Sequence, residues 1–147
     1  MARLFALVTA ILLFTSSALA SESPVYTGLL SNTAVGGYDT VSYFEAGGPA
    51  KGSARHTVEY NGATWRFANP ENLALFKEEP ERYAPAYGGY CAWAISQGNL
   101  AKGDPKYWTV RDGRLYLNYS QSVHDQWLED PEGFIRQANE KWPKVLE

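Results

Sequence analysis

The sequence has few of the residues from which covalent cross-links and metal sites are made. It contains one cysteine, one methionine and two histidines among 147 residues. A single cysteine excludes an intramolecular disulfide and any metal or redox motif of the Cys-x-x-Cys type. The net charge is −3, and no run of five like charges is present. A mildly acidic chain lacks the basic patches that bind nucleic acids or anionic membranes, so we expect neither as a partner.

Long hydrophobic runs are also absent beyond the first 20 residues. Within those residues, Arg3 precedes an apolar run from Leu4 to Phe14, and Ala18-Leu19-Ala20 has the small-x-small pattern of a cleavage site. This arrangement is typical of a secretory signal peptide at residues 1–20, and the apolar run is too short for a membrane span of about 20 residues. We therefore expect export, most simply to a bacterial periplasm, and no membrane association after the signal is removed.

The rest of the chain predicts two β-hairpins. His56–Tyr60 and Ala63–Phe67 are rich in β-branched and aromatic residues, and Asn61-Gly62 between them is a strong signal for a type I′ turn. The same pattern recurs around Asp112-Gly113. Its flanking segments are Tyr107–Arg111 and Arg114–Asn118.

Short helices are predicted around the hairpins. Asn69 followed by Pro70 is a typical helix start, and Pro80 ends that helix. Further helices are expected at Tyr90–Gln97 and twice near the C-terminus, where Asp130-Pro131 starts the last one.

No internal repeat or linker stands out. The predicted fold is one small α+β domain. Its expected divisions are an N-terminal arm at 21–36 and a domain at 37–145.

Aromatic residues are abundant, at 14% of the chain. They can fill a dense core without disulfides, and they can also line a ligand pocket. Composition alone does not separate the two. The residues predicted for such a pocket are Tyr38, Tyr43, Trp65, Tyr90 and Trp93.

Cys91 has the widest range of roles. A lone thiol in an exported chain is buried and inert, paired with a second molecule as a disulfide-linked homodimer, bound to a metal, or reactive. Gly88 and Gly89 allow a sharp turn into a helix, where free N–H groups lower a thiol pKa and favour catalysis or redox chemistry. The apolar neighbours of Cys91 are equally typical of burial.

A metal site would have to be assembled from distant residues. Cys91, His56 and His124 would supply sulfur and nitrogen, and Asp39 an oxygen, a donor set that suits copper or zinc. No short metal-binding spacing supports this set. The alternatives are two surface histidines and an Asp39 that caps the short helix after it.

The order of motifs from Gly37 to about Val145 resembles the YHS-domain family. The resemblance rests on three segments: the opening Gly37–Phe44, the hairpin Glu59–Asn69, and Pro80–Ala92 with its Gly-Gly-Tyr-Cys string. It implies a small α+β module related to treble-clef-like metal-binding domains, some of which handle copper through cysteines.

This sequence departs from the metal-binding form of that family. Ser42 and Asn72 stand where that form has cysteines. Cys91 lies further along, in a motif of the secreted branch. Some members of that branch carry selenocysteine in the same context, which implies a redox-active position.

Three functions remain open from the residues alone. The leading hypothesis is an exported accessory or binding module in metal or redox homeostasis, centred on Cys91. The first alternative is a thiol-dependent oxidoreductase with Cys91 as its catalytic residue. The second is a structural module with an inert Cys91 and an aromatic surface that meets a protein partner. Whether the protein is an enzyme is left open.

Overall fold

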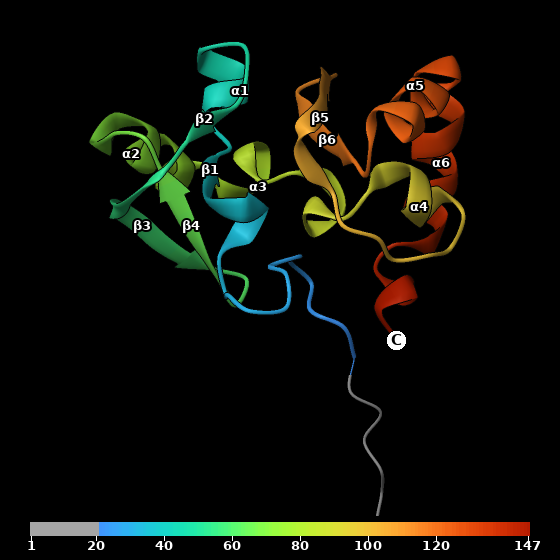
Figure 1. The fold of residues 1–147 in the computed structure, drawn as a ribbon, viewed down its shortest axis with the longest axis horizontal. Helices are drawn as coiled ribbons and strands as arrows, with labels where there is room; N and C mark the ends of the chain where they lie inside the picture. Colours follow the sequence, from blue (N-terminus) through green and yellow to red (C-terminus); the bar gives the residue numbers. More distant parts are fainter. Residues whose placement is uncertain (1–20) are drawn as a thin grey trace, which may run out of the picture.

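The structure, a computed structural model, describes residues 21–147, so the predicted signal peptide lies outside the described residues. Figure 1 shows the helices and strands gathered into two groups that lie side by side. We call residues 34–83 the first half and residues 86–141 the second half. The helices and three small antiparallel sheets confirm the predicted α+β class.

The first half consists of short elements around one long hairpin. In chain order they are η1 (Ala34–Gly37), β1 (Tyr38–Asp39), α1 (Ser42–Glu45), β2 (Ala50–Lys51), β3 (Ser53–Tyr60), β4 (Ala63–Phe67), α2 (Pro70–Glu78) and α3 (Pro80–Tyr83). Strand β1 pairs with β2, and β3 pairs with β4.

The second half has the same order of elements, with an isolated bridge between Tyr90 and Lys102 in place of the β1–β2 pair. A last short turn, η3, follows it. The elements are η2 (Ala86–Gly89), α4 (Ala92–Ser96), β5 (Asp104–Arg111), β6 (Arg114–Asn118), α5 (Gln121–Glu129), α6 (Pro131–Lys141) and η3 (Lys144–Leu146).

The two long hairpins have the same register. Val58 lies opposite Trp65 in the first, and Thr109 lies opposite Tyr116 at the matching place in the second. Both hairpins shift register after their outermost pair. The structure is therefore a repeat of one unit, and the expectation of no internal repeat is wrong. The repeat is hard to see in the sequence because the halves share few residues outside their turns.

Local signals account for most element boundaries. Asn61 and Gly62 both have positive φ, as do Asp112 and Gly113, which confirms the two predicted type I′ turns. The side chain of Asn69 accepts a hydrogen bond from the backbone N–H three residues on, which confirms the start of α2. Ser120 and Asp130 start α5 and α6 in the same way.

The helix predicted at Tyr90–Gln97 is shorter than expected. Tyr90 is extended and pairs with Lys102, and the Cys91 N–H donates to the carbonyl of Ala101 at 2.9 Å. Because both residues are held by this neighbouring segment, α4 begins only at Ala92.

Each half has its own apolar core. Trp65, Phe67 and Phe76 are buried in the first core, while Ile95 and Trp127 are buried in the second. Strand β6 lies between the cores. Its two leucines pack into the first core, and its tyrosine packs into the second. Both faces of β6 are thus covered.

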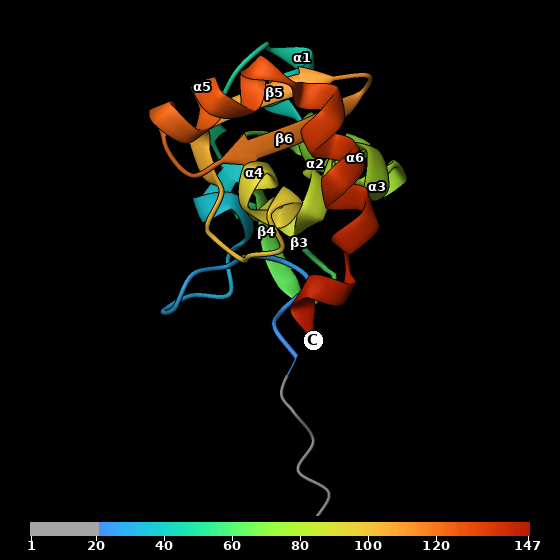
Figure 2. The ribbon, with the colours of Figure 1, turned by 90° about the vertical axis from the view of Figure 1, so that its right-hand side faces the viewer.

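The segment before the first half crosses to the second half, close to the C-terminus (Figure 2). The Glu22 N–H donates to the Leu146 carbonyl at 2.8 Å, and the Tyr26 N–H donates to the Gly88 carbonyl at 3.0 Å. Val25 is buried in the first core. Within residues 21–147, no helix combines the length and the apolar character needed to cross a membrane.

Candidate thiol site

A sharp backbone turn delivers Cys91 to its place. Tyr87, Gly88 and Gly89 all have positive φ, which is a left-handed conformation. A Cβ atom on Gly88 would lie 1.8 Å from the carbonyl oxygen of Pro24, so only glycine fits there. After this turn the chain is extended through Tyr90, and the side chain of Cys91 points into the protein, where it is 1% exposed.

The sulfur of Cys91 lies among backbone donors. The backbone N–H groups of Ala94, Tyr119 and Trp93 favour a negative charge on Sγ, and the Trp93 N–H donates to Oδ1 of Asn118 at 3.1 Å. The amide of Asn118 completes the surroundings, because Sγ lies 3.5 Å from its Oδ1 and donates the thiol hydrogen to it. We call these three N–H groups and this amide the Cys91 socket.

Two opposing effects act on the thiol. Burial raises the pKa of Cys91, because it removes water from a charged thiolate. The three N–H groups lower the pKa by stabilising the thiolate, but burial has the larger effect. The pKa therefore lies above its ordinary value, and Cys91 is a protonated thiol at neutral pH.

The matching place in the first half is occupied by a carboxylate. Asp39 is fully buried, and its Oδ1 accepts from the N–H groups of Val41 at 2.9 Å and Ser42 at 3.2 Å. Its Oδ2 accepts from the N–H of Ala68 at 2.9 Å and from Nδ2 of Asn72 at 2.7 Å. We call these four donors the Asp39 socket. The predicted cap role of Asp39 agrees with the first two bonds.

The backbone donors of the two sockets occupy equivalent positions. In each half, two donors are the N–H groups two and three residues after the acceptor side chain. The third belongs to the residue that directly follows the long hairpin, Ala68 in one half and Tyr119 in the other. Cys91 thus stands where the repeated unit holds the Asp39 carboxylate.

The fourth donor differs between the sockets. The α5 residue that matches Asn72 is Val123, which has no polar side chain. Asn118 instead brings an amide from the end of β6, where the first half has Phe67. Asn118 is fully buried, and within residues 21–147 its Nδ2 has no acceptor. The amide whose oxygen contacts the thiol therefore has one unused donor.

The two positions where the family resemblance implies metal-binding cysteines adjoin Asp39. Ser42 Oγ donates to the carbonyl of Asp39 at 2.6 Å, and Asn72 Nδ2 donates to its carboxylate. In this chain, residues 42 and 72 hold Asp39 in place.

The remaining predicted metal ligands lie in different elements. His124 is on α5, where its Nε2 is 2.9 Å from Thr109 Oγ1 and partial burial lowers its pKa. His56 lies on β3, in the other half. Within residues 21–147, no three His, Cys, Asp or Glu side chains meet in a group that could hold a metal ion.

The five predicted pocket residues are divided between the two cores. Tyr38, Tyr43 and Trp65 belong to the first core, and Tyr90 and Trp93 belong to the second. Trp65 also lines a cleft of about 310 Å³, and Tyr90 lines a separate hollow of about 370 Å³ beside the N-terminal segment. These aromatic rings mainly fill cores.

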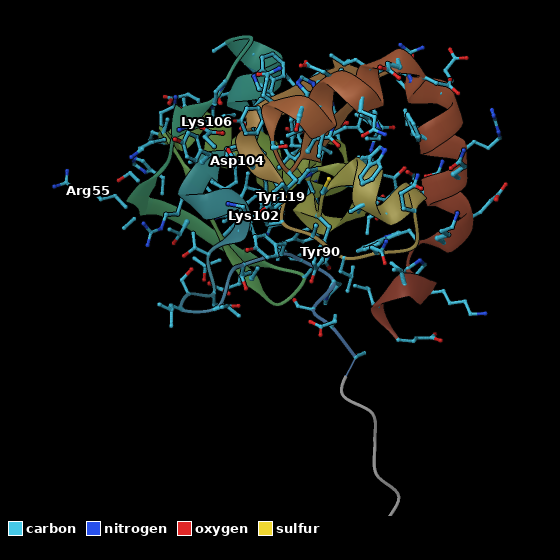
Figure 3. All side chains as sticks on the ribbon, turned by 45° about the vertical axis from the view of Figure 1, so that its right-hand side comes forward. Arg55, Tyr90, Lys102, Asp104, Lys106 and Tyr119 are labelled. Atoms are coloured by element: carbon cyan, nitrogen blue, oxygen red, sulfur yellow. The ribbon has the colours of Figure 1, made fainter. Side chains whose placement is uncertain are left out.

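The Cys91 socket lies one residue beneath the surface. The N–H of Tyr119 faces the sulfur, while its side chain is 48% exposed. The ammonium of Lys102 lies 5.5 Å from the centre of the Tyr119 ring, and Figure 3 shows the two side chains beside each other, with Tyr90 nearby.

Asn118 and Tyr119 are absent from the predicted site residues. The sequence carries one signal for them: Ala-x-Gly-Gly-Tyr occurs at residues 34–38 and again at 86–90. Aligning the two copies places Cys91 beside Asp39, and aligning the hairpin turns places Tyr119 beside Ala68.

The fold and the site define a class of protein: a small α+β protein made of two similar halves, with a single buried thiol in the second. The YHS domain family model matches residues 41–87, which cover most of the first half and end before Cys91. No curated protein and no solved structure matches the chain.

Proposed function

We propose that this protein is an exported redox module in which Cys91 reacts with small hydroperoxides. One observation carries the proposal: the sulfur of Cys91 occupies a socket whose backbone donors match those that hold the Asp39 carboxylate. The backbone donors favour negative charge on sulfur and partly offset the effect of burial, and the thiolate is the form that reacts.

Burial favours a small oxidant. The thiol is 1% exposed, so a disulfide of a second protein does not reach the sulfur without extensive opening. A hydroperoxide is small and uncharged, so it needs less opening of the core than a protein disulfide does. The raised pKa of Cys91 keeps most molecules in the thiol form and makes the reaction slow at neutral pH. Slow reaction suits a module that responds to accumulated oxidant.

The chemistry needs only the thiol and the oxidant. The thiol loses its proton to water, and the thiolate attacks one oxygen of the hydroperoxide. The S–O bond forms as the O–O bond breaks, and the leaving alkoxide or hydroxide takes up a proton. Sulfur is oxidised by two electrons to a sulfenic acid, and the peroxide is reduced by two electrons to an alcohol or water. A low-molecular-weight thiol restores Cys91 by forming and then exchanging a mixed disulfide.

Trapping of the sulfenic acid tests this proposal. The protein is treated with hydrogen peroxide under native conditions in the presence of a sulfenic-acid-specific reagent, and the adduct is located by mass spectrometry. We expect an adduct on Cys91 that forms faster as the pH rises, because the thiolate fraction grows. A Cys91→Ser variant should give no adduct.

The same trapping experiment in denaturant distinguishes a thiol that reacts slowly in the native protein from one that does not react there at all. If Cys91 is trapped only after unfolding, and never in the native protein over the pH range in which the fold is stable, the proposal is wrong and the thiol is a structural core residue.

A further inference from the structure

We infer that the Cys91 socket is built to hold the doubly oxidised side chain, cysteine sulfinate, as the first half holds Asp39. The inference rests on the proposed reaction of Cys91 with hydroperoxides. It makes Cys91 a modification site with a stable oxidised end state inside the core.

The argument starts from the shape of the two side chains. A sulfinate has two oxygens and one negative charge on the atom bonded to Cβ, as does the carboxylate of aspartate. Asp39 and Cys91 hold equivalent places in the repeated unit. The three residues whose N–H groups donate to Asp39 have their counterparts in Trp93, Ala94 and Tyr119, whose N–H groups favour a negative charge on the sulfur. Oxidation of Cys91 to a sulfinate would reproduce the chemical group for which the first half provides those donors.

Asn118 supplies the missing fourth donor. In the first half, Nδ2 of Asn72 donates to the second carboxylate oxygen of Asp39 at 2.7 Å. In the second half, Asn118 presents Oδ1 to the thiol, and its buried Nδ2 has no acceptor among the described residues. Rotation of the amide exchanges the two atoms, so that Nδ2 donates to a sulfinate oxygen.

The same amide therefore serves both states of the sulfur. As a thiol, Cys91 donates to Oδ1 of Asn118. As a sulfinate, it accepts from Nδ2. The Trp93 N–H, which donates to Asn118 Oδ1 at 3.1 Å, loses this acceptor when the amide rotates and becomes available to a sulfinate oxygen. No buried donor that surrounds the sulfur is then left without an acceptor, and an unsatisfied donor at this depth would be costly.

The second oxidation step is balanced in the same way as the first. The sulfur of the sulfenic acid attacks a second hydroperoxide, one S–O bond forms and the O–O bond breaks. The peroxide is reduced by two electrons to an alcohol or water, and the sulfinic acid releases its proton to solvent. The product is an anion, which most protein cores would not tolerate without paired donors.

The substitution Cys91→Asp tests the socket without any oxidation chemistry. Aspartate mimics the sulfinate, so we expect the variant to fold and to melt within about 4 °C of the wild type or above it. The matched control is Ala92→Asp, because Ala92 is the next residue and is also 1% exposed. It should melt at least about 10 °C lower or fail to fold, since a buried charge there has no socket.

The contribution of Asn118 is measured in the Cys91→Asp background. Adding Asn118→Leu removes the fourth donor and should reduce the folding equilibrium constant about tenfold or more, because a hydrogen bond to a charged group is lost. In the wild-type background, Asn118→Leu removes an acceptor from the thiol and from the Trp93 N–H, and it should cost less because no charged group loses a hydrogen bond.

Direct formation of the modification completes the test. Prolonged treatment of the wild type with hydrogen peroxide should add two oxygen atoms at Cys91, and the product should keep its melting temperature. The inference is overturned if Cys91→Asp unfolds as Ala92→Asp does, or if the doubly oxidised protein melts far below the reduced one. A stable Cys91→Asp variant together with an unreactive wild-type thiol would show that the socket accepts an anion, but it would overturn the proposed function and, with it, the sulfinate as the occupant of the socket.

Discussion

The two long hairpins have the same register but differ on one face. In the first hairpin, that face of β4 carries the half-buried Thr64 and Arg66. At the matching positions of β6, Leu115 and Leu117 are fully buried, because this face packs on the first core. The repeated backbone thus has one partly solvated copy and one copy covered on both sides. A repeat can keep its geometry while its surroundings change what each position does.

The same contrast applies to the two sockets. Asp39 carries a charge that four donors satisfy, and it ties together β1, α1 and α2. Cys91 is neutral. Its socket has the equivalent backbone donors, but a thiol is a much weaker acceptor for them than a carboxylate. The first socket therefore stabilises the fold, whereas the second retains an unused capacity to hold an anion.

Truncation of Asp39 and of Cys91 to alanine should give the largest difference in stability between the two halves. Asp39→Ala leaves four donors without this acceptor, two of them fully buried, and should lower the free energy of unfolding by about 3–5 kcal/mol. Cys91→Ala removes one small apolar group and should cost about 1 kcal/mol. Denaturant titration of both variants measures the difference. Equal losses would mean that Cys91 in its socket already contributes as much to the stability of the fold as Asp39 does.

The next largest difference in stability is expected at equivalent positions of β4 and β6, on the face that is half-buried in β4 and fully buried in β6. Leu115→Ala empties a fully buried site between the cores and should cost about 3 kcal/mol. Thr64→Ala, at the equivalent place in the first half, should cost less than about 1 kcal/mol. Thermal unfolding of the two variants provides the comparison, and a similar cost at both positions would show that the halves do not pack through β6.

A matched pair of glycines tests how the N-terminal segment packs. Gly88→Ala places a Cβ atom against the Pro24 carbonyl and should cost about 2–3 kcal/mol, from the clash and from the left-handed backbone. In Gly36→Ala, at the equivalent turn, the new Cβ would be 3.8 Å from its nearest neighbour, Pro105, so only the backbone strain remains, at about 1 kcal/mol. If deletion of residues 21–27 leaves the cost of Gly88→Ala unchanged, this explanation is wrong.

The smallest effect is a pH dependence confined to the second half. Burial lowers the pKa of His124 from the ordinary value of 6.5, against a smaller opposing effect of Asp125. The unfolded chain then binds a proton more readily than the folded protein, so stability is full above about pH 6.5 and falls as the pH drops. The loss should stay below about 1 kcal/mol, because the ring is partly solvated.

The first half supplies the control for this effect. Its counterparts of His124 and Thr109 are Leu73 and Val58, an apolar pair. The double variant His124→Leu with Thr109→Val should therefore show a smaller loss of stability between pH 7 and 5 than the wild type. An unchanged pH profile would assign the acid sensitivity to other groups.

Much of the local structure was accessible from the sequence. Asn61-Gly62 and Asp112-Gly113 specify their turns through residues that tolerate positive φ, and Asn69 and Asp130 specify helix starts through side-chain caps. These signals depend on only a few neighbouring residues, so they can be interpreted without knowledge of the fold.

The site itself depends on long-range packing. The burial of Cys91 follows from the segment that contains Ala101 and from β6, which alternation patterns do not place in space. Asn118 reads as an ordinary strand end until the hairpin brings it beside the sulfur. The predicted metal set of Cys91, His56, His124 and Asp39 combined residues from both halves, and chemical type alone does not reveal which half holds each residue.

The most direct test of this account is a crystal structure of the peroxide-treated protein at a resolution that shows the oxygens on Cys91. The account predicts a sulfinate within the socket, with its oxygens accepting from the N–H groups of Trp93, Ala94 and Tyr119 and from the rotated amide of Asn118. An unmodified sulfur after native treatment, or an oxidised side chain turned out of the socket with its backbone donors left empty, would contradict it.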